Sequence, residues 1–511
     1  MSRAALQQVS ERFAAPEALL EHLGASFRMR TVRLEEMRAC APAFDVLSYA
    51  DSLRRRCVAL RQASGELILV LGDPYDDGTQ DWLEERVRTP FEYRVAHHEE
   101  LAAFLTQQEE GLRAMDGVAS AAAGDAPQNG DGAQLISIEA ISESASPVVK
   151  LVDSTLYDAL KAGASDIHLE TGAKGLTVKY RIDGVLNLVK IVEGTEFAEQ
   201  AISRVKVMAE LDIAERRVPQ DGRFRARSKD RDIDFRVSVM PSVFGEDAVL
   251  RILDRRALSE SLQGLTLQQL GFEPGMVAAL QRLSCQPHGM LLVTGPTGSG
   301  KTTTLYAVIT EVNKGLDKIV TIEDPVEYRL PGVLQIPVNE KKGLTFARGL
   351  RSILRHDPDR IMVGEIRDPE TAEIAVQSAL TGHLVYTTVH ANNVFEVIGR
   401  FMHMGVDTFN LVCALNAVMA QRLVRKRCTA CEAKGCAHCR GTGYRGRKAI
   451  AELMVLNDEL RGLILERAPT ARLKAAARAT GTRTLREAAL ELVGRGETTM
   501  EEADRVTFVA D

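Results

Sequence analysis

The chain has 511 residues, of which 45% are hydrophobic and 26% charged, and 64 basic against 70 acidic side chains give a net charge of −6. This composition is typical of a globular protein with several domains, and the acidic balance argues against a surface coated for binding nucleic acid. The first twenty residues lack the apolar core of an export signal, and no stretch of about 18 apolar residues occurs. We therefore expect a cytoplasmic protein whose contact with a membrane is peripheral.

The stretch DGVASAAAGDAPQNGDGAQ divides the chain. It offers almost nothing to bury, so it predicts a flexible linker at 116–135 after an N-terminal domain at 1–115. Strand and helix patterns in that domain predict a small α/β fold. The strand patterns lie at Leu67–Leu71 and Phe91–Val95, and the helix patterns at Trp82–Val87 and His98–Phe104.

Two further domains follow the linker. Residues 136–262 mix two helical patterns with several alternating strand patterns and predict an α+β domain, whereas strands alternate with helices over 263–511, as in a parallel α/β sheet. In the α+β domain the helices are expected at Pro147–Ala162 and Glu199–Glu210, and the strands at Ser165–Glu170, Leu176–Leu186, Asp232–Met240 and Ala248–Leu253.

The motif G-x-x-x-x-G-K-T follows the apolar run Met290–Thr294 and precedes a helical pattern. Strand, glycine-rich turn and helix together form the context of a phosphate-binding loop, in which backbone N–H groups surround phosphate oxygens. Lys301 is expected to reach the β- and γ-phosphates of ATP, and Thr302 to bind Mg²⁺. The expected nucleotide-binding residues are Gly295, Pro296, Thr297, Gly298, Ser299, Gly300, Lys301, Thr302 and Thr303.

Acidic residues follow two other apolar strands of this domain. One strand ends in the acids Glu323, Asp324 and Glu327, and a second, Arg360–Val363, is followed by Gly364 and Glu365. Acids at the carboxyl ends of parallel strands beside a phosphate loop are placed to manage Mg²⁺ and the attacking water. A third strand ends at His390, which we expect to sense the γ-phosphate or a neighbouring subunit.

Four of the eight cysteines fall within twelve residues. The spacing C-x₂-C-x₄-C-x₂-C suits a tetrahedral Zn²⁺ site with four thiolates, which leaves no open position for a substrate. Disulfides or free thiols remain the alternative. The expected zinc ligands are Cys428, Cys431, Cys436 and Cys439.

A basic run, RLVRKRC, precedes these cysteines. Arg422, Arg425, Lys426 and Arg427 suit either anionic lipid headgroups, at roughly 1 kcal/mol per charge, or a solvated helix end.

Together these motifs resemble the secretion ATPase superfamily, and above all its type II secretion assembly ATPases, with type IV pilus assembly ATPases close behind. The resemblance extends from about Pro147 to the end of the chain. It rests on GASDIHLE, RRVPQDGRF, GPTGSGKT, TIEDPVE, LRSILRHDPDRIMVGEIRD and TTVHANN. It implies a RecA-like ATPase core preceded by a PAS-like α+β domain and a small N-terminal α/β domain.

The resemblance also implies roles for single residues. Glu327 would polarise the attacking water, Glu365 would be the Walker B acid, and a glycine at position 364 would be a family trait. The last position of the "His box" is Asn393 where many relatives have Asp, which puts the role of that acid in doubt. The preceding domain would supply arginines to the phosphates, with Arg217, Arg223 and Arg236 as candidates.

By the same resemblance, the chain would work as a homohexamer that hydrolyses Mg-ATP. It would drive an inner-membrane platform protein that extrudes a pilin-like filament, and its N-terminal domain would dock to a membrane-anchored protein. Retraction-type pilus ATPases generally lack the cysteine element, which favours an assembly enzyme. A nucleic-acid translocase and a nucleotide-binding scaffold without hydrolysis are the alternatives; the absence of a basic face with interleaved aromatic residues argues against the first.

Overall fold

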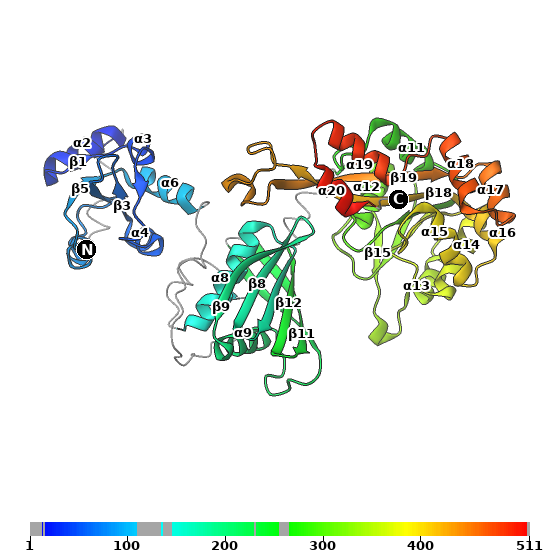
Figure 1. The fold of residues 1–511 in the computed structure, drawn as a ribbon, viewed down its shortest axis with the longest axis horizontal. Coiled ribbons are helices and arrows are strands. Elements are labelled where there is room, and N and C mark those ends of the chain that lie inside the picture. Colours follow the sequence, from blue (N-terminus) through cyan, green and yellow to red (C-terminus); the bar gives the residue numbers. More distant parts are fainter. Residues whose placement is uncertain are drawn as a thin grey trace. The chain divides into compact units, whose positions relative to one another are not determined.

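A computed structural model describes Phe13 and residues 16–109, 134–135, 146–228, 231–254 and 265–507. The chain divides into two compact units, one of residues 1–182 and 186–253 and the other of residues 183–185 and 254–511. The first unit contains two separate sheets and the second contains one (Figure 1). The expected linker lies outside the described residues except for its last two positions.

Within the described residues, the N-terminal part forms a five-stranded sheet of mixed direction. The two strands predicted here are confirmed as β4 and β5, because both stretches are strands of the sheet. The strands, in spatial order, are β1 (Arg30–Thr31), β5 (Phe91–Val95), β4 (Leu67–Leu71), β3 (Cys57–Arg61) and β2 (Ala41–Pro42). The helices are α2 (Pro16–Phe27), α3 (Leu34–Arg38), α4 (Tyr49–Arg55), α5 (Asp77–Arg86) and α6 (His98–Glu109).

The described middle part is an α+β domain, as expected. Its helices α8 (Pro147–Ala162) and α9 (Thr195–Met208) share one apolar core with the sheet. Ser146 caps the start of α8, and Gly163 ends it in the left-handed region that favours glycine. In spatial order the strands are β6 (Gln134–Leu135), β10 (Gln220–Ser228), β11 (Arg231–Ser242), β12 (Gly245–Leu253), β7 (Asp166–Gly172), β8 (Gly175–Ile182) and β9 (Val185–Glu193).

The strand β10 was not predicted. Its sequence, QDGRFRARS, is highly charged, but it alternates in the strand period, with Ala226 buried and the flanking arginines exposed. The partly buried ring of Phe224 stacks on that of Phe235, with 4.7 Å between the ring centroids. One apolar face therefore suffices for this strand, because the other faces solvent.

The second unit contains a sheet of seven strands, of which the last runs antiparallel to its neighbour. The strands, in spatial order, are β15 (Leu334–Pro337), β14 (Ile319–Glu323), β16 (Arg360–Val363), β17 (Leu384–Val389), β13 (Gly289–Thr294), β18 (Leu415–Arg427) and β19 (Tyr444–Val455). The α-helices described are α11 (Pro274–Ser284), α12 (Lys301–Val312), α13 (Phe346–Ile353), α14 (Pro369–Leu380), α15 (Val394–His403), α16 (Thr408–Ala414), α17 (Asp458–Leu465), α18 (Thr470–Ala479), α19 (Leu485–Gly494) and α20 (Met500–Val506).

The central strand β13 is buried on both faces. Met290 and Leu292 join a core with α13–α16, while Leu291 and Val293 join a second core with α11 and α12. This burial explains why the strand reads as an unbroken apolar run, and it confirms the predicted parallel α/β fold. The hairpin of β18 and β19 extends past the sheet and carries the four clustered cysteines (Figure 1). Within the described residues, no helix is long and apolar enough to span a membrane.

Candidate functional site

The predicted phosphate loop joins β13 to α12. Gly295, Gly298 and Gly300 have φ angles of 149°, 78° and 85°, which favour glycine. A Cβ added to Gly295 would lie 2.6 Å from the Gln421 carbonyl oxygen, so a side chain there would collide with β18. The motif glycines therefore allow both the turn and the close approach of two strands.

Lys301, the first residue of α12, folds back over this loop. Its Nζ donates hydrogen bonds to the carbonyl oxygens of Gly295 at 2.8 Å and Pro296 at 3.1 Å. Burial lowers the pKa of Lys301, and the Glu365 carboxylate opposes that shift. The buried Ser299 hydroxyl has no hydrogen-bond partner in the described part of the chain. A helix N-terminus, a lysine and an unpartnered hydroxyl fit a nucleotide phosphate.

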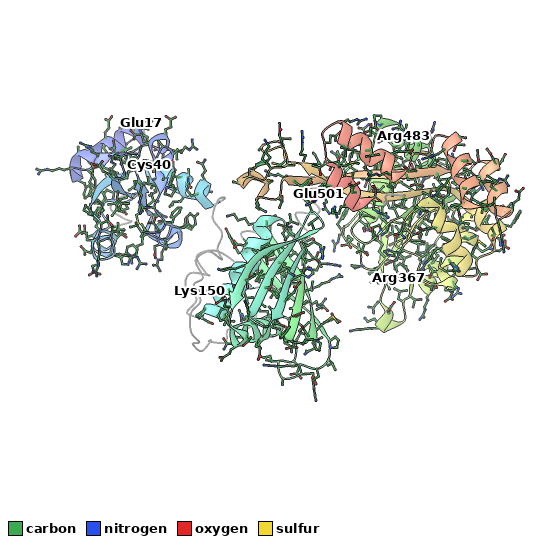
Figure 2. All side chains as sticks on the ribbon, in the orientation of Figure 1. Glu17, Cys40, Lys150, Arg367, Arg483 and Glu501 are labelled. Carbon is green, nitrogen blue, oxygen red and sulfur yellow. The ribbon has the colours of Figure 1, made fainter. Side chains whose placement is uncertain are left out.

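Glu365 lies beyond the end of β16 and is the centre of a charged cluster. Its carboxylate accepts hydrogen bonds from Arg367 and, at 3.2 Å, from His390 Nε2. Arg367, labelled in Figure 2, also lies 3.6 Å from the Asp324 carboxylate. Burial acts to raise the pKa of Glu365, but Arg367 and His390 lower it overall, so the group is ionised at neutral pH. The structure thus brings together Lys301, Glu365 and His390, as the sequence predicted.

Gly364 occupies the position where a second P-loop motif usually carries Asp. A Cβ there would lie 3.2 Å from the Ile322 carbonyl oxygen and 3.4 Å from the Glu323 Cα. The Gly364 carbonyl also accepts a 2.7 Å hydrogen bond from the Thr388 hydroxyl. Close packing between β14 and β16 therefore disfavours a side chain at this position, and the acid follows one residue later.

The three acids at and just after the end of β14 do not share one environment. Glu323 is only 2% exposed and accepts hydrogen bonds from Tyr306, Thr321 and Gln335. The expectation that Glu323 manages Mg²⁺ or water is therefore wrong, because its oxygens already have buried partners. Asp324 and Glu327 lie on the exposed segment that follows.

Gln421, on β18, is a functional residue that sequence reasoning missed. It is 1% exposed; its Nε2 donates a 2.8 Å hydrogen bond to the Ser299 carbonyl, and its Oε1 accepts one at 2.8 Å from Thr304 Oγ1. The side chain thus ties the phosphate loop and α12 to the neighbouring strand. The available sequence cue was an amide that directly follows the apolar run AVMA.

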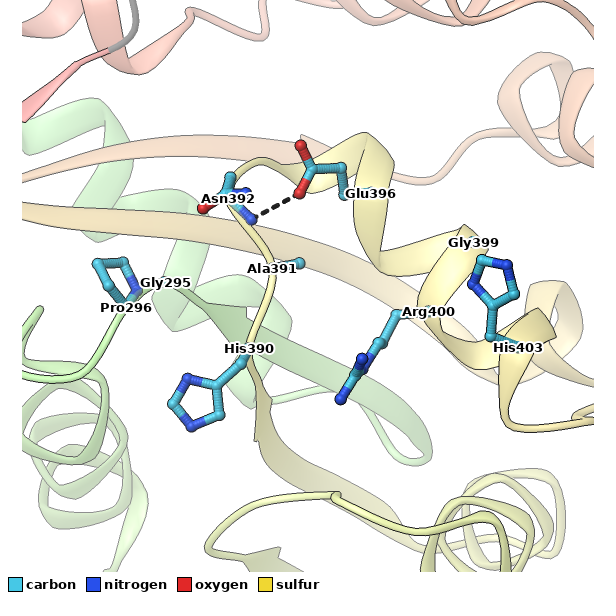
Figure 3. Close-up of a pocket in the computed structure, with 9 residues that line it drawn as sticks. All are labelled: Gly295, Pro296, His390, Ala391, Asn392, Glu396, Gly399, Arg400 and His403. Carbon is cyan, nitrogen blue, oxygen red and sulfur yellow. Dashed lines mark hydrogen bonds between the residues drawn. The ribbon is translucent and has the colours of Figure 1, made fainter.

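A cavity of about 460 Å³ opens beside the phosphate loop. Figure 3 shows His390 on the segment after β17, and Arg400 and His403 on α15, around the same space. The lining residues are Gly295, Pro296, His390, Ala391, Asn392, Glu396, Gly399, Arg400 and His403.

Asn393 caps α15 by accepting hydrogen bonds from the backbone N–H groups of Phe395 and Glu396 at 3.1 and 3.0 Å. An amide caps a helix as well as a carboxylate does, so asparagine preserves this structural role.

The three candidate arginines of the middle domain fall into two groups. Arg223 on β10 and Arg236 on β11 face each other directly in the sheet register, and both are exposed. Arg217 lies on the preceding loop, where it forms a 2.8 Å ion pair with Glu215. The structure therefore brings Arg223 and Arg236 together and places Arg217 apart from them.

The four clustered cysteines converge at the end of the β18–β19 hairpin. All four sulfurs lie within 4.8 Å of one another, and they form the one group of this kind found among the described residues. The sulfur–sulfur distances are 3.9 Å for Cys428–Cys436, 3.6 Å for Cys431–Cys439 and 3.7 Å for Cys436–Cys439. Zn–S bonds of about 2.3 Å in a tetrahedron place sulfurs about 3.8 Å apart, so the cluster fits Zn²⁺.

Backbone N–H groups support this cluster from outside. Those of Cys436 and Gly443 each donate a 3.2 Å hydrogen bond to Cys439 Sγ. Four residues separate Cys431 from Cys436. The chain turns back over this short distance at Glu432 and Ala433, whose φ angles are 49° and 69°. Two left-handed residues thus make the short gap compatible with a four-thiolate site.

The expectation for the basic run needs correction. The run lies on β18 rather than at a helix end. Arg422 donates a 2.8 Å hydrogen bond to the Asn392 carbonyl beside the phosphate loop, and Arg425 forms a 2.8 Å ion pair with the buried Glu502. Neither guanidinium is available to lipid, and Lys426 is the exposed member of the run.

Purified protein is expected to contain about one equivalent of zinc, and Cys431→Ser is expected to lose most of it. The reason is that three thiolates leave one tetrahedral position without a protein ligand. Elemental analysis checks the content, with Cys285→Ser as the matched control because Cys285 is exposed and outside the cluster. Less than about half an equivalent in the unaltered protein would contradict the assignment.

The chain has a phosphate-binding loop beside acids at the ends of strands in a mostly parallel sheet, and an α+β domain precedes this sheet in the sequence. Together these features define a RecA-like P-loop ATPase. The chain belongs to the family described as "Type II/IV secretion system protein", whose model matches residues 142–505. A second model, the MshEN domain, matches residues 27–114. The chain is therefore an ATP-hydrolysing enzyme that uses ATP and Mg²⁺, and its four thiols fit Zn²⁺.

Several relatives carry type II secretion names. Type II secretion system protein HxcR of Pseudomonas aeruginosa is 47% identical over 374 residues, which cover 72% of this chain and 78% of the relative. Type II secretion system protein E of Xanthomonas campestris pv. campestris is 41% identical over 480 residues, covering 87% and 82%. Type II secretion system ATPase E of Vibrio cholerae is 45% identical over 391 residues, covering 72% and 76%.

Solved structures give the same fold. The ATPase DotB of Yersinia pseudotuberculosis superposes with a TM-score of 0.53 at 22% identity, covering 70% of this chain and 92% of that one. DotB of Legionella pneumophila gives 0.52 at 21% identity, covering 69% and 94%. These likenesses concern the fold alone.

Proposed function

We propose that this chain is the motor of a type II secretion system, a homohexamer that hydrolyses Mg-ATP to drive assembly of a pseudopilus and protein export. The observation that carries the proposal is the phosphate loop with Lys301, Glu365 and His390 clustered at one sheet edge, in a chain whose relatives carry type II secretion names. The runner-up is a motor for type IV pilus assembly.

In the proposed reaction, Lys301 exchanges its bonds to two loop carbonyls for bonds to the nucleotide phosphates. Thr302 and the ionised Glu365 would hold Mg²⁺, which neutralises the charge that develops on the phosphates. Glu327 would polarise the attacking water. His390, hydrogen-bonded to Glu365 beside the cavity, would respond to the γ-phosphate or to a neighbouring subunit.

The middle domain would contribute arginines to this reaction. Arg223 and Arg236 are opposite each other on paired strands, and two adjacent guanidinium groups repel unless an anion lies between them. We infer that this pair receives a phosphate group. Arg217 is the weaker candidate because its guanidinium already pairs with Glu215.

Partners and location belong to the same proposal. The motor would act at the inner face of the inner membrane on a platform protein, and the N-terminal α/β domain would dock to a membrane-anchored protein. The corresponding domain boundaries are 1–115, 116–135, 136–262 and 263–511. Pull-down from membranes, with the N-terminal domain deleted as the comparison, would identify the two partners separately.

A gene deletion in the source bacterium separates the two leading functions. We expect loss of exported enzymes from the medium with surface pili intact, and restoration of export by the unaltered chain. Loss of pili with export intact would replace the proposal with the pilus motor. Stimulation of ATP turnover by single-stranded DNA, with none by vesicles of anionic lipid, would instead favour a nucleic-acid translocase.

A further inference from the structure

We propose that Tyr306, Glu323 and Gln335 form a positioning network that sets Glu327 relative to the phosphate loop. The network is not part of the nucleotide cluster, and each of its members comes from a different element: α12, β14 and β15. This inference rests on the proposed role of Glu327 as the residue that polarises water. It adds a physical link between the helix that begins with Lys301 and the segment that carries Glu327.

The Glu323 carboxylate is the centre of the network. Its Oε2 accepts a hydrogen bond from the Tyr306 hydroxyl, and its Oε1 accepts bonds from Thr321 Oγ1 at 2.5 Å and Gln335 Nε2 at 3.1 Å. The carboxylate is 2% exposed, and none of the ion pairs found among the described residues includes it. Three neutral donors therefore satisfy a buried acid, an arrangement that is costly to disturb.

Tyr306 connects this acid to the segment that carries Glu327. Its hydroxyl donates to Glu323 and accepts from Gln335 Nε2 at 3.5 Å, and its ring packs against that of Tyr328, the residue after Glu327. Tyr306 is fully buried and lies on α12, which begins with Lys301 and Thr302. One phenol therefore joins the nucleotide-binding helix to the segment of the residue proposed to handle water.

Gln335 forms hydrogen bonds with the same segment further along the chain. Its Nε2 also donates to the Tyr328 carbonyl at 3.1 Å, and its Oε1 accepts from the Leu330 backbone N–H at 2.7 Å. The rings of Tyr306 and Tyr328 meet edge to face, with centroids 4.5 Å apart. The segment after β14 is thus held at Tyr328 and Leu330, directly after Glu327, by side chains from two flanking elements.

This arrangement makes a specific kinetic prediction. The network does not touch the phosphate loop itself, so nucleotide affinity should survive its disruption. The distance from Glu327 to the attacking water should change, and a displacement of about 1 Å can cost about 100-fold in rate. A network residue should therefore affect kcat and leave nucleotide binding nearly unchanged.

The first test replaces Tyr306 with phenylalanine in the full chain. We expect kcat for ATP to fall about 10-fold to 100-fold, while the Kd for ADP changes less than about two-fold. The matched control is Tyr386→Phe, because Tyr386 is also fully buried and its hydroxyl donates to the Ser284 carbonyl at 3.1 Å, outside this network. Equal kcat in the two variants, or a parallel loss of kcat and ADP affinity, would overturn the proposal.

A second variant covers the case in which Tyr306→Phe fails to fold. Gln335 is only partly buried, so Gln335→Leu can be accommodated at the surface of β15, and it is expected to show the same selective loss of kcat. Thermal unfolding of each variant separates positioning from general destabilisation. An unchanged kcat in a folded Gln335→Leu protein would contradict the network.

A double-mutant cycle separates this inference from the proposed function. If the network acts through Glu327, adding Tyr306→Phe to Glu327→Gln should lower kcat by less than about two-fold more. If the kcat losses of the two single variants multiply in the double variant, the network acts elsewhere and the inference is overturned. Full activity of Glu327→Gln alone would instead overturn the proposed role of Glu327.

Discussion

Replacing Lys301 with methionine is expected to reduce ATP hydrolysis at least about 100-fold and to weaken nucleotide binding strongly. Methionine keeps most of the side-chain length but has no charge and no donors. Among the described residues, the hydrogen bonds of the Lys301 ammonium go to two carbonyls of its own loop, so the fold should tolerate the change. Phosphate release and titration with a fluorescent ADP analogue measure the two effects.

Lys314→Met is the matched control for this experiment. Lys314 is exposed just beyond the end of α12, so its replacement should leave kcat within about two-fold. A Lys301→Met enzyme that retains a tenth or more of the unaltered kcat would show that the loop uses another cation. Arg422, which lies beside Gly295 and acts electrostatically on Lys301, would then be the first residue to examine.

Replacing Glu327 with glutamine is expected to lower kcat about 100-fold to 1000-fold while nucleotide affinity stays within about three-fold. The amide preserves the size of the side chain but cannot accept a proton from water. Glu327 lies on the exposed segment after β14, so the fold should be unaffected. Single-turnover hydrolysis and ADP titration on the same preparation separate chemistry from binding.

Glu501→Gln on α20 serves as the control, because Glu501 is exposed and lies in the first turn of that helix (Figure 2). Its kcat should match that of the unaltered chain. If Glu327→Gln hydrolyses ATP normally, Glu365 becomes the candidate for activating water. Its ionised carboxylate and its hydrogen bond to His390 are compatible with that role.

Local patterns predicted much of the fold because they depend on short-range physics. The helix at Pro147–Ala162 has the expected bounds, since its serine cap, first-turn proline and terminal glycine are all adjacent in sequence. The phosphate loop was equally readable, because its glycines are required by the backbone of the loop itself. Apolar runs likewise located the strands that are buried on both faces.

The remaining features depend on residues far apart in the chain. Three acids near the end of β14 looked equivalent, yet Glu323 is buried by Tyr306 and Gln335, which come from other elements. Gln421 contacts the phosphate loop across more than a hundred residues of sequence. The basic run could not be assigned to strand or helix by charge alone, and the buried Glu502 that pairs with Arg425 lies 77 residues further along the chain.

The position of the cysteine cluster allows the length of the β18–β19 connection to vary. The strands β18 and β19 stay paired up to Arg427 and Tyr444, and the cysteines lie wholly in the connection beyond that point. The closure entropy of a connection changes slowly with its length, so residues can be added or removed there without disturbing the ATPase sheet. The zinc element is therefore a length-tolerant insert, and its size can change between relatives while the nucleotide site stays the same.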